Sequence, residues 1–204
     1  MLTRSQRFIK RSFDIVFSSF GLLITLPIII VAWLLASIET RSNGMFSQIR
    51  IGKNGKPFRI YKIKTMSAST DFMTTITTAN DQRITRSGAF FRRTKIDELP
   101  QLWNVLKGDM SFVGPRPDVP GYADKLEGED KIVLSVRPGI TGPASLKYKN
   151  EETILAQVED PKAYNDTVIW PDKVKVNKEY VQNWSFKKDL DCILKTFIQD
   201  RKSV

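Results

Sequence analysis

The longest apolar stretch of the chain lies near its N-terminus. No residue from Ile15 to Ile38 carries a formal charge, and Ile, Leu, Val, Phe and Trp fill most positions. A straight helix over this stretch is about 36 Å long, more than the ~30 Å hydrocarbon layer of a bilayer. The stretch is also longer than the apolar core of a cleaved signal peptide. The pattern therefore predicts a membrane helix, and a single span is the first interpretation.

Two features of this stretch favour a re-entrant helix over a span. Pro27 follows Leu26 near the middle, where a proline removes a backbone hydrogen bond and clashes with the preceding turn. Basic residues flank both ends, which is typical of cytoplasmic flanks. They are Arg4, Arg7, Lys10 and Arg11 before the stretch, and Arg41, Arg50, Lys53, Lys56 and Arg59 after it. We expect residues 1–40 to enter the membrane, break or bend at Leu26 and Pro27, and return to the same face.

The remaining chain, residues 41–204, is predicted to form a cytosolic catalytic domain. β-favouring residues at 46–51 and 58–64 flank Asn54-Gly55, a strong signal for a β-hairpin. Prolines then divide the chain into short helices and loops, with no long linker between domains. A short helix is expected to begin at or just after Asp97-Glu98, because apolar residues follow helical spacing there. These residues are Leu99, Leu102, Trp103 and Leu106.

A C-terminal amphipathic helix is also predicted. The apolar positions with helical spacing are Phe186, Leu190, Ile193, Leu194, Phe197 and Ile198. Lysines occupy the other faces, and Trp184 precedes the helix. This helix either packs against the core or lies on anionic lipid, and the sequence leaves both interpretations open.

Composition narrows the classes of partner and of chemistry. The formal net charge is +10, which fits nucleic acid, an anionic membrane surface or a phosphorylated substrate. The apolar stretch favours the membrane, so nucleic acid is not expected as a partner. The chain has no histidine, which excludes the usual proton shuttle and the usual zinc or copper ligand. The single cysteine, Cys192, fits a reducing compartment and a buried, inert thiol.

The strongest candidate for chemistry is the acidic pair Asp97-Glu98. Cations lie nearby in sequence at Arg92, Arg93 and Lys95. A carboxylate in such a setting can attack a phosphoryl group, and its neighbour can hold Mg²⁺. Helix capping is the alternative, since acidic residues are common in a first turn. Arg116, fixed between Pro115 and Pro117, suits a phosphate clamp and favours the first interpretation.

These motifs together resemble the bacterial sugar transferase family, whose smallest members are monotopic phosphoglycosyl transferases of the bacterial inner membrane. The resemblance covers nearly the whole chain. It is carried by Lys10-Arg11-x-Phe13-Asp14, Gln48-x-Arg50-x-Gly52, Tyr61-Lys62-Ile63-Lys64-Thr65-Met66, the long block Asp97-Glu98-Leu99-Pro100-Gln101-Leu102-x-Asn104-Val105-Leu106-Lys107-Gly108-Asp109-Met110-Ser111-x-Val113-Gly114-Pro115-Arg116-Pro117, and Arg137-Pro138-Gly139-Ile140-Thr141-Gly142.

The resemblance implies a fold, a reaction and a location. The fold is α+β and mostly helical, with a re-entrant membrane helix, a β-hairpin and amphipathic interfacial helices. The reaction moves a sugar 1-phosphate from a UDP-sugar to undecaprenyl phosphate with Mg²⁺, through a covalent aspartyl-phosphosugar, and begins the assembly of a surface glycan. The location is the cytoplasmic face of the inner membrane, in contact with membrane lipids.

The resemblance also implies the roles of individual residues. Asp97 is the expected nucleophile and Glu98 helps to hold Mg²⁺, with both carboxylates near the metal. Lys64, Arg92, Arg116 and Arg137 are the expected phosphate contacts. The chain departs from the family pattern at Leu26, at Pro143 and at Asn177. A rival interpretation is a non-catalytic, basic, membrane-tethered binding module, which explains the charge but not the dense block from Asp97 to Pro117.

Overall fold

The computed structural model of the protein describes residues 2–67 and 81–201 and has a mixed, mostly helical architecture. Its principal elements are α1 (Arg4–Thr40), β1 (Met45–Ile51), β2 (Pro57–Ile63), α2 (Arg86–Thr94), α3 (Gln101–Lys107), β3 (Ser111–Val113), β4 (Gly139–Thr141), α4 (Pro143–Lys147), α5 (Glu151–Leu155), α6 (Pro161–Tyr164), α7 (Trp170–Gln182) and α8 (Phe186–Arg201). Short 3₁₀ turns lie at Lys53–Gly55, Ile96–Glu98, Ala123–Lys125 and Gly128–Ser135, and a π-helical turn lies at Asn165–Ile169.

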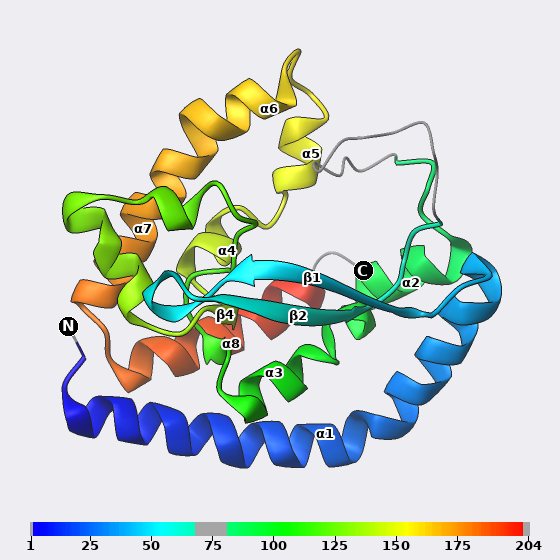
Figure 1. Ribbon diagram of the computed structural model, residues 1–204, viewed down its shortest axis with the longest axis horizontal. Coiled ribbons are helices and arrows are strands. Elements are labelled where there is room, and N and C mark those ends of the chain that lie inside the picture. The colour runs from blue at the N-terminus through cyan, green and yellow to red at the C-terminus, as the bar shows by residue number, and fades with distance from the viewer. Residues whose placement is uncertain (1, 68–80, 202–204) are drawn as a thin grey trace.

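The predicted N-terminal membrane helix is α1, which is continuous and contains Pro27. Its first turn is closed by a capping box between Thr3 and Gln6. Figure 1 shows the helix bending partway along its length. The helix is therefore not interrupted at Leu26 and Pro27, where the sequence predicts a break or a bend. By length and composition α1 could cross a membrane.

The first half of α1 turns polar groups inward and apolar groups outward. Lys10, Asp14 and Ser18 are buried and lie four residues apart, on one face of the helix. The Asp14 carboxylate accepts hydrogen bonds from the Ser111 hydroxyl (3.0 Å) and the Phe112 amide (3.1 Å). The exposed apolar residues of α1 include Val16, Phe20, Leu23, Ile24 and Val31. This pattern is the reverse of a helix that packs against a core in water.

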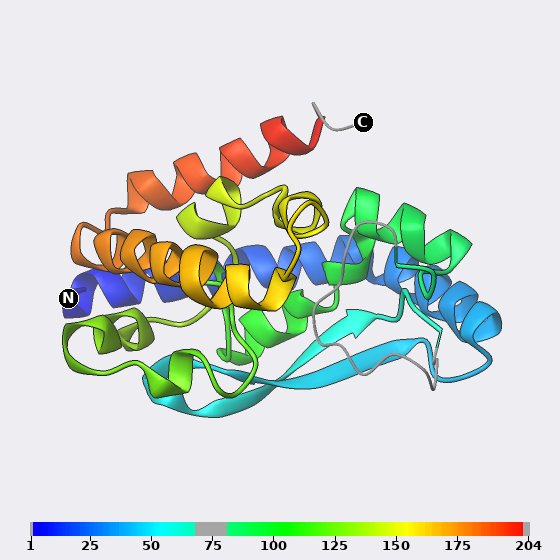
Figure 2. The same ribbon diagram turned by 90° about the horizontal axis from the view of Figure 1, so that it is seen from above.

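The predicted hairpin is confirmed. β1 and β2 pair antiparallel from Met45↔Ile63 to Ile51↔Pro57. Both turn residues have positive φ, +59° for Asn54 and +73° for Gly55, as this dipeptide readily allows. The hairpin and α8 lie on opposite sides of the molecule in Figure 2, with α1 and α3 between them. The hairpin thus forms one wall of the protein.

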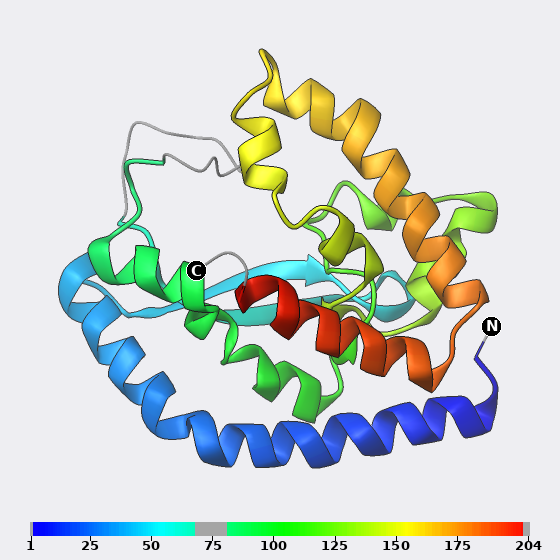
Figure 3. The same cartoon turned by 180° about the vertical axis from the view of Figure 1, so that it is seen from behind.

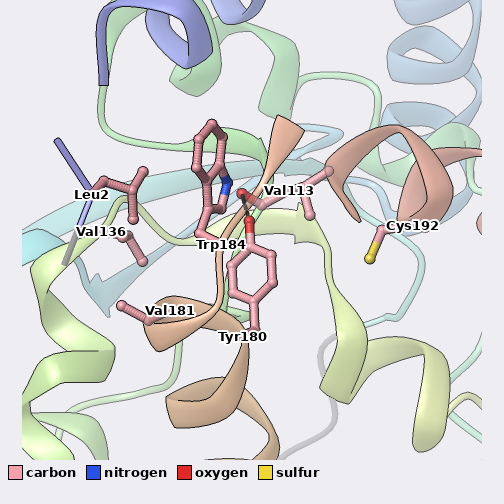
Figure 4. Close-up of a cluster of buried hydrophobic side chains, with 7 residues drawn as sticks. All are labelled: Leu2, Val113, Val136, Tyr180, Val181, Trp184 and Cys192. Carbon is pink, nitrogen blue, oxygen red and sulfur yellow. Dashed lines mark hydrogen bonds between the residues drawn. The ribbon is translucent and has the colours of Figure 1, made fainter. Parts of the chain in front are cut away.

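The predicted C-terminal helix is also confirmed, as α8, and Figure 3, which views the molecule from behind, shows it crossing in front of the hairpin. Cys192 belongs to a buried cluster with Tyr180 and Trp184 (Figure 4), and the Asp189 carboxylate accepts hydrogen bonds from the Tyr180 hydroxyl and the Trp184 indole. The opposite face exposes apolar residues, namely Leu190, Leu194, Phe197 and Ile198. One face of α8 therefore packs inward, as the first interpretation predicts, while the other face is uncovered and its contact with lipid stays a prediction.

An ion pair at one end and a hydrogen bond at the other join α1 to the rest of the protein. Near the start, Lys10 Nζ lies 2.5 Å from Asp189 Oδ2 of α8. Near the end, the Glu39 carboxylate accepts from the Ser87 hydroxyl (2.6 Å) at the beginning of α2. The cluster of Ile29, Ala32 and Ala36 of α1 with Ile63 and Phe91 adds apolar contact there. The two ends of α1 are thus anchored on the same folded body.

Candidate active site

The acidic pair lies in the 3₁₀ turn Ile96–Glu98, between α2 and α3. Lys95 ends α2 with a positive φ of +59°, which redirects the chain. Ile96 and Leu99 then pack against the apolar cluster under α1. α3 begins at Gln101, just after the pair as predicted, and neither acidic side chain caps either helix. The capping interpretation of the pair is therefore wrong.

Two cations compensate Glu98. Its Oε1 atom accepts from Lys62 Nζ of β2 (3.0 Å) and from Arg116 NH2 (2.5 Å). Burial by itself would raise the pKa of Glu98, but the charges of Arg116 and Lys62 outweigh burial and hold that pKa far below its usual range. Glu98 is therefore ionised at any physiological pH.

Asp97 lies in the opposite situation. Its side chain is buried, with only 8% of the residue exposed, and its Oδ1 atom has no hydrogen-bond partner. Burial, together with the adjacent charge of Glu98, raises the pKa of Asp97 to about 6, despite the nearby cations Lys62, Lys95 and Arg92. The sequence predicts that Arg92, Arg93 and Lys95 keep Asp97 ionised, but desolvation is the larger effect on its pKa. The charge of Asp97 is therefore less well compensated than that of Glu98.

Close backbone packing fixes Arg116. β3 and β4 pair in parallel, Ser111↔Gly139 and Val113↔Thr141. A Cβ atom on Gly114 would approach the Arg137 carbonyl oxygen to 2.5 Å, so only glycine fits between these strands. Arg116 then donates to the Ile140 carbonyl (3.3 Å) as well as to Glu98. The rigid loop that the prolines predict is thus held from both sides.

The other three predicted phosphate contacts, Arg92, Lys64 and Arg137, have partners outside the acidic pair. Arg92 NH2 pairs with Glu152 Oε1 of α5 (2.5 Å), although its charge still acts on Asp97. Lys64 Nζ donates to the Ser42 hydroxyl (2.7 Å). Arg137 Nε donates to the Gly108 carbonyl (2.7 Å), and it lines a separate small crevice beside Lys10 and Asp14. The structure therefore gathers Asp97, Glu98, Arg116 and Lys62, and leaves Lys64 and Arg137 with other partners.

The sequence interpretation missed a second group of charges beside Arg116. Burial raises the pKa of Asp118 to about 7, against the opposing charges of Lys173 and Arg50. Arg50 NH1 donates to the Pro117 carbonyl (3.2 Å), and the buried Arg50 Nε has no partner. Lys173 in turn pairs with Glu151 of α5 at 2.6 Å. The sequence could have pointed to Asp118 by its position directly after Arg116-Pro117.

The acidic pair also fits a magnesium ion bound together with a phosphorylated ligand. Within residues 2–67 and 81–201 no group of three or more acidic or cysteine side chains is placed to hold a metal. Mg²⁺, however, commonly uses one or two carboxylates and takes its remaining ligands from substrate phosphates and water. Asp97 Oδ1 is unpartnered, and only the Oε1 atom of Glu98 takes part in ion pairs. Two carboxylate oxygens are thus available.

The geometry described so far gathers two carboxylates with Arg116 and Lys62, in a protein whose described residues include one long, exposed apolar helix. Comparison with known families identifies it further, because the model of the bacterial sugar transferase family matches residues 5–201. The chain belongs to this family. The resemblance stated from the motifs is confirmed, and so is the expectation that the protein is a transferase.

Relatives of known name agree with this assignment. A Bacillus subtilis protein, provisionally named an undecaprenyl-phosphate N-acetylgalactosaminyl 1-phosphate transferase, is 48% identical over 59% of this chain and 68% of its own length. UDP-glucose:undecaprenyl-phosphate glucose-1-phosphate transferases of Caulobacter vibrioides and Escherichia coli are each 34% identical, over 92% and 96% of this chain. The matched regions cover 67% of the Caulobacter protein and 40% of the E. coli protein. The chain thus spans less than half of its larger relatives.

Proposed function

We propose that the protein transfers a sugar 1-phosphate from a UDP-sugar to undecaprenyl phosphate. The observation that carries this proposal is the contrast within the acidic pair, where Glu98 is held by two cations and Asp97 Oδ1 is buried without a partner. The names of the relatives support both substrates. The product would be the first lipid-linked intermediate of a surface glycan.

In the first step, the Asp97 carboxylate attacks the phosphorus atom that bears the sugar. The new bond is an acyl phosphate, and the P–O bond to the nucleotide breaks, so UMP leaves with the electron pair. No proton transfer is required, which suits a site without histidine. Arg116, held in place by Ile140 and Glu98, faces the negative charge of the diphosphate.

In the second step, a phosphate oxygen of the lipid acceptor attacks the same phosphorus atom. The bond to Asp97 breaks and the carboxylate leaves, which restores the enzyme and yields a polyprenyl diphosphosugar. The raised pKa of Asp97 reflects a carboxylate whose charge is poorly solvated in the free enzyme. Such a carboxylate is a better nucleophile than one held by hydrogen bonds.

Asp97 and Glu98 are the residues that would hold Mg²⁺ together with the donor diphosphate. The ion supplies positive charge that offsets the charge on the diphosphate. Glu98→Gln should therefore lose activity and shift the Mg²⁺ concentration that half-saturates the enzyme. A variant with an unchanged Mg²⁺ response would count against this assignment.

Membrane attachment through a re-entrant α1 belongs to the same proposal. Both ends of α1 are anchored on one folded body, through Lys10–Asp189 and through Glu39–Ser87. A single span would require these two contacts to lie on opposite sides of the bilayer. The basic flanks favour the cytoplasmic face of the inner membrane. The uncovered apolar face of α8 would then lie in the interface.

A labelling experiment in detergent tests the proposed chemistry. Wild-type protein given a UDP-sugar labelled at the sugar-bearing phosphate, without acceptor, should retain label covalently, and undecaprenyl phosphate should then release it. Asp97→Asn should retain none, whereas the control Asp191→Asn, an exposed residue of α8, should behave like wild type. Transfer at the wild-type rate by Asp97→Asn would exclude the nucleophilic role. Binding of anionic lipid without UMP release by wild type would favour the non-catalytic module.

A further inference from the structure

A large groove lies beside the acidic site, along the hairpin. Its volume is about 890 Å³, which falls in the ~300–1,000 Å³ range of small-molecule pockets. One wall is formed by Gln48 and Ile49 of β1, and another by Tyr122 and Trp170. The groove takes no part in the chemistry described above.

Hydrogen bonds along β1 show which backbone groups point into this groove. In an antiparallel pair, successive residues alternate between facing the partner strand and facing away from it. The amides of Met45 and Ile51 face away from β2, since they donate to Asn43 Oδ1 and to the Asp118 carbonyl, each at 2.9 Å. The alternation therefore turns the N–H and C=O of Ile49 outward too. Within the described part of the chain, neither group has a hydrogen-bond partner.

The facing wall offers an aromatic surface. The rings of Tyr122 and Trp170 meet edge to face, with centroids 5.4 Å apart. The Tyr122 hydroxyl donates to Asp166 Oδ1 (2.7 Å), which fixes the ring. Trp170 directly follows the π-helical turn Asn165–Ile169, an irregularity that is frequent at functional sites. The groove thus combines a fixed aromatic wall with one free backbone donor and one free acceptor.

The groove is joined to the acidic site by the hairpin and by one loop. Gln48 lies two residues along β1 from Phe46, whose cross-strand partner is Lys62, so Gln48 and Lys62 share a face of the hairpin. Gln48 and Lys62 are thus diagonal neighbours across the two strands, about 7–8 Å apart. Arg50 bridges the two regions, because it donates to Gln48 Oε1 (2.8 Å) and to the Pro117 carbonyl. The chain from Arg116 to Tyr122 therefore runs from the acidic site to the groove.

We propose that this groove binds the uracil base of the UDP-sugar, with the outward N–H and C=O of Ile49 pairing with the imide edge of the base and Trp170 lying against its face. The inference rests on the proposed function for the identity of the donor. Uracil presents one donor, N3–H, between two acceptors, O2 and O4. The Ile49 C=O can accept from N3–H while the Ile49 N–H donates to either O2 or O4, so the strand edge fits the base in two orientations.

Proline substitution tests the backbone contact, because proline removes an N–H and is tolerated on an edge strand where that N–H faces away from the sheet. Ile49→Pro should weaken UMP binding, measured by calorimetry, about tenfold, the upper end of the effect of one net hydrogen bond. Ser47→Pro is the matched control: its N–H also faces outward on β1, but Ser47 does not line the groove. Its UMP affinity should equal that of wild type.

A ligand change provides the second half of the test. UMP methylated at N3 lacks the imide donor, so it should bind wild type about tenfold more weakly than UMP, and Ile49→Pro should weaken it little further. Trp170→Ala should weaken both ligands equally, since stacking does not depend on N3–H. This variant also tests the groove if Ile49→Pro fails to fold, as judged by its melting temperature.

The outcomes separate the groove from the chemistry. Wild-type transfer activity with unchanged UMP affinity in both Ile49→Pro and Trp170→Ala would overturn the groove assignment and leave the proposed function intact. Absence of transfer by wild type would overturn the proposed function. The UMP affinities of the variants would still test whether the groove binds the base. Equal weakening by Ile49→Pro and Ser47→Pro would also reject the specific contact at Ile49.

Discussion

Arg116 donates a hydrogen bond to the Glu98 carboxylate (2.5 Å), and this contact makes the electrostatic environments of Asp97 and Glu98 different. The two residues come from different elements, a loop after β3 and a turn before α3. Because Arg116 and Lys62 both take the Oε1 atom, the charge of Glu98 is compensated while that of Asp97 is not. Asp97, the proposed nucleophile, and Glu98 are thus set apart by their electrostatic environments.

Arg116→Lys should reduce the sugar-phosphate transfer rate by at least tenfold. A lysine has one compact ammonium group and cannot span the Ile140 carbonyl and the Glu98 carboxylate as the guanidinium does. The rate should be compared with that of Arg93→Lys, at an exposed position on α2 whose guanidinium lies over the Phe90 ring. A rate for Arg116→Lys within twofold of wild type would show that the fork geometry is not needed.

The pH dependence of transfer should report Asp97. The pKa of Asp97 is raised to about 6, and only the ionised carboxylate attacks phosphorus, so activity should be full above about pH 7 and fall about tenfold per unit below pH 6. Glu98 stays ionised throughout this range, because its pKa is held far below the usual value. A profile of kcat/KM against pH checks this, and a flat profile down to pH 5 would contradict it.

The same raised pKa predicts that Asp97 costs stability at neutral pH. An acid whose folded pKa exceeds its unfolded value favours the folded state at low pH, and this contribution is lost as pH rises through the folded pKa. Asp97→Asn should therefore raise the free energy of unfolding by up to roughly 3 kcal/mol at about pH 8, and the gain should vanish below about pH 4. Thermal or denaturant melts at the two pH values measure this.

Glu98 supplies a matched comparison of opposite sign. Its folded pKa is depressed, so its ion pairs stabilise the protein above the unfolded pKa and lose their effect as pH falls. Glu98→Gln should therefore lower the melting temperature at about pH 8, where Asp97→Asn raises it. Destabilisation by both variants at that pH would show that packing, and not the unequal charges, governs the turn.

Local chemistry made the hairpin and α3 predictable. Asn54-Gly55 accepts positive φ at both turn positions, and the spacing after Glu98 matches the helix that begins at Gln101. The two lysines near the end of the second strand were harder to distinguish. β2 ends at Ile63, so Lys62 reaches Glu98, whereas Lys64 turns to Ser42. A strand pattern gives the face of a side chain but not its partner.

The sequence could not predict the partners of site residues that depend on pairing between distant segments. Arg137 belongs to a conspicuous Arg-Pro-Gly motif, yet the parallel pairing of β3 with β4 directs it to the Gly108 carbonyl. That pairing joins segments separated by more than twenty residues, and no local propensity encodes it. The polar inner stripe of α1 was hidden for a similar reason. Asp14 finds Ser111 and Phe112 only in the folded chain.

The topology of α1 can be decided by labelling two engineered cysteines. Leu2 is buried and unsuitable as a probe, but Ser5 is exposed at the start of α1, and Lys56 is exposed at the hairpin turn. With the buried Cys192 replaced by alanine, Ser5→Cys and Lys56→Cys should both resist a membrane-impermeant thiol reagent in spheroplasts. Both should react with it in inverted vesicles, because the Lys10–Asp189 ion pair holds the start of α1 on the body that carries the hairpin. Labelling of Ser5→Cys alone in spheroplasts would establish a single span and reject the re-entrant helix.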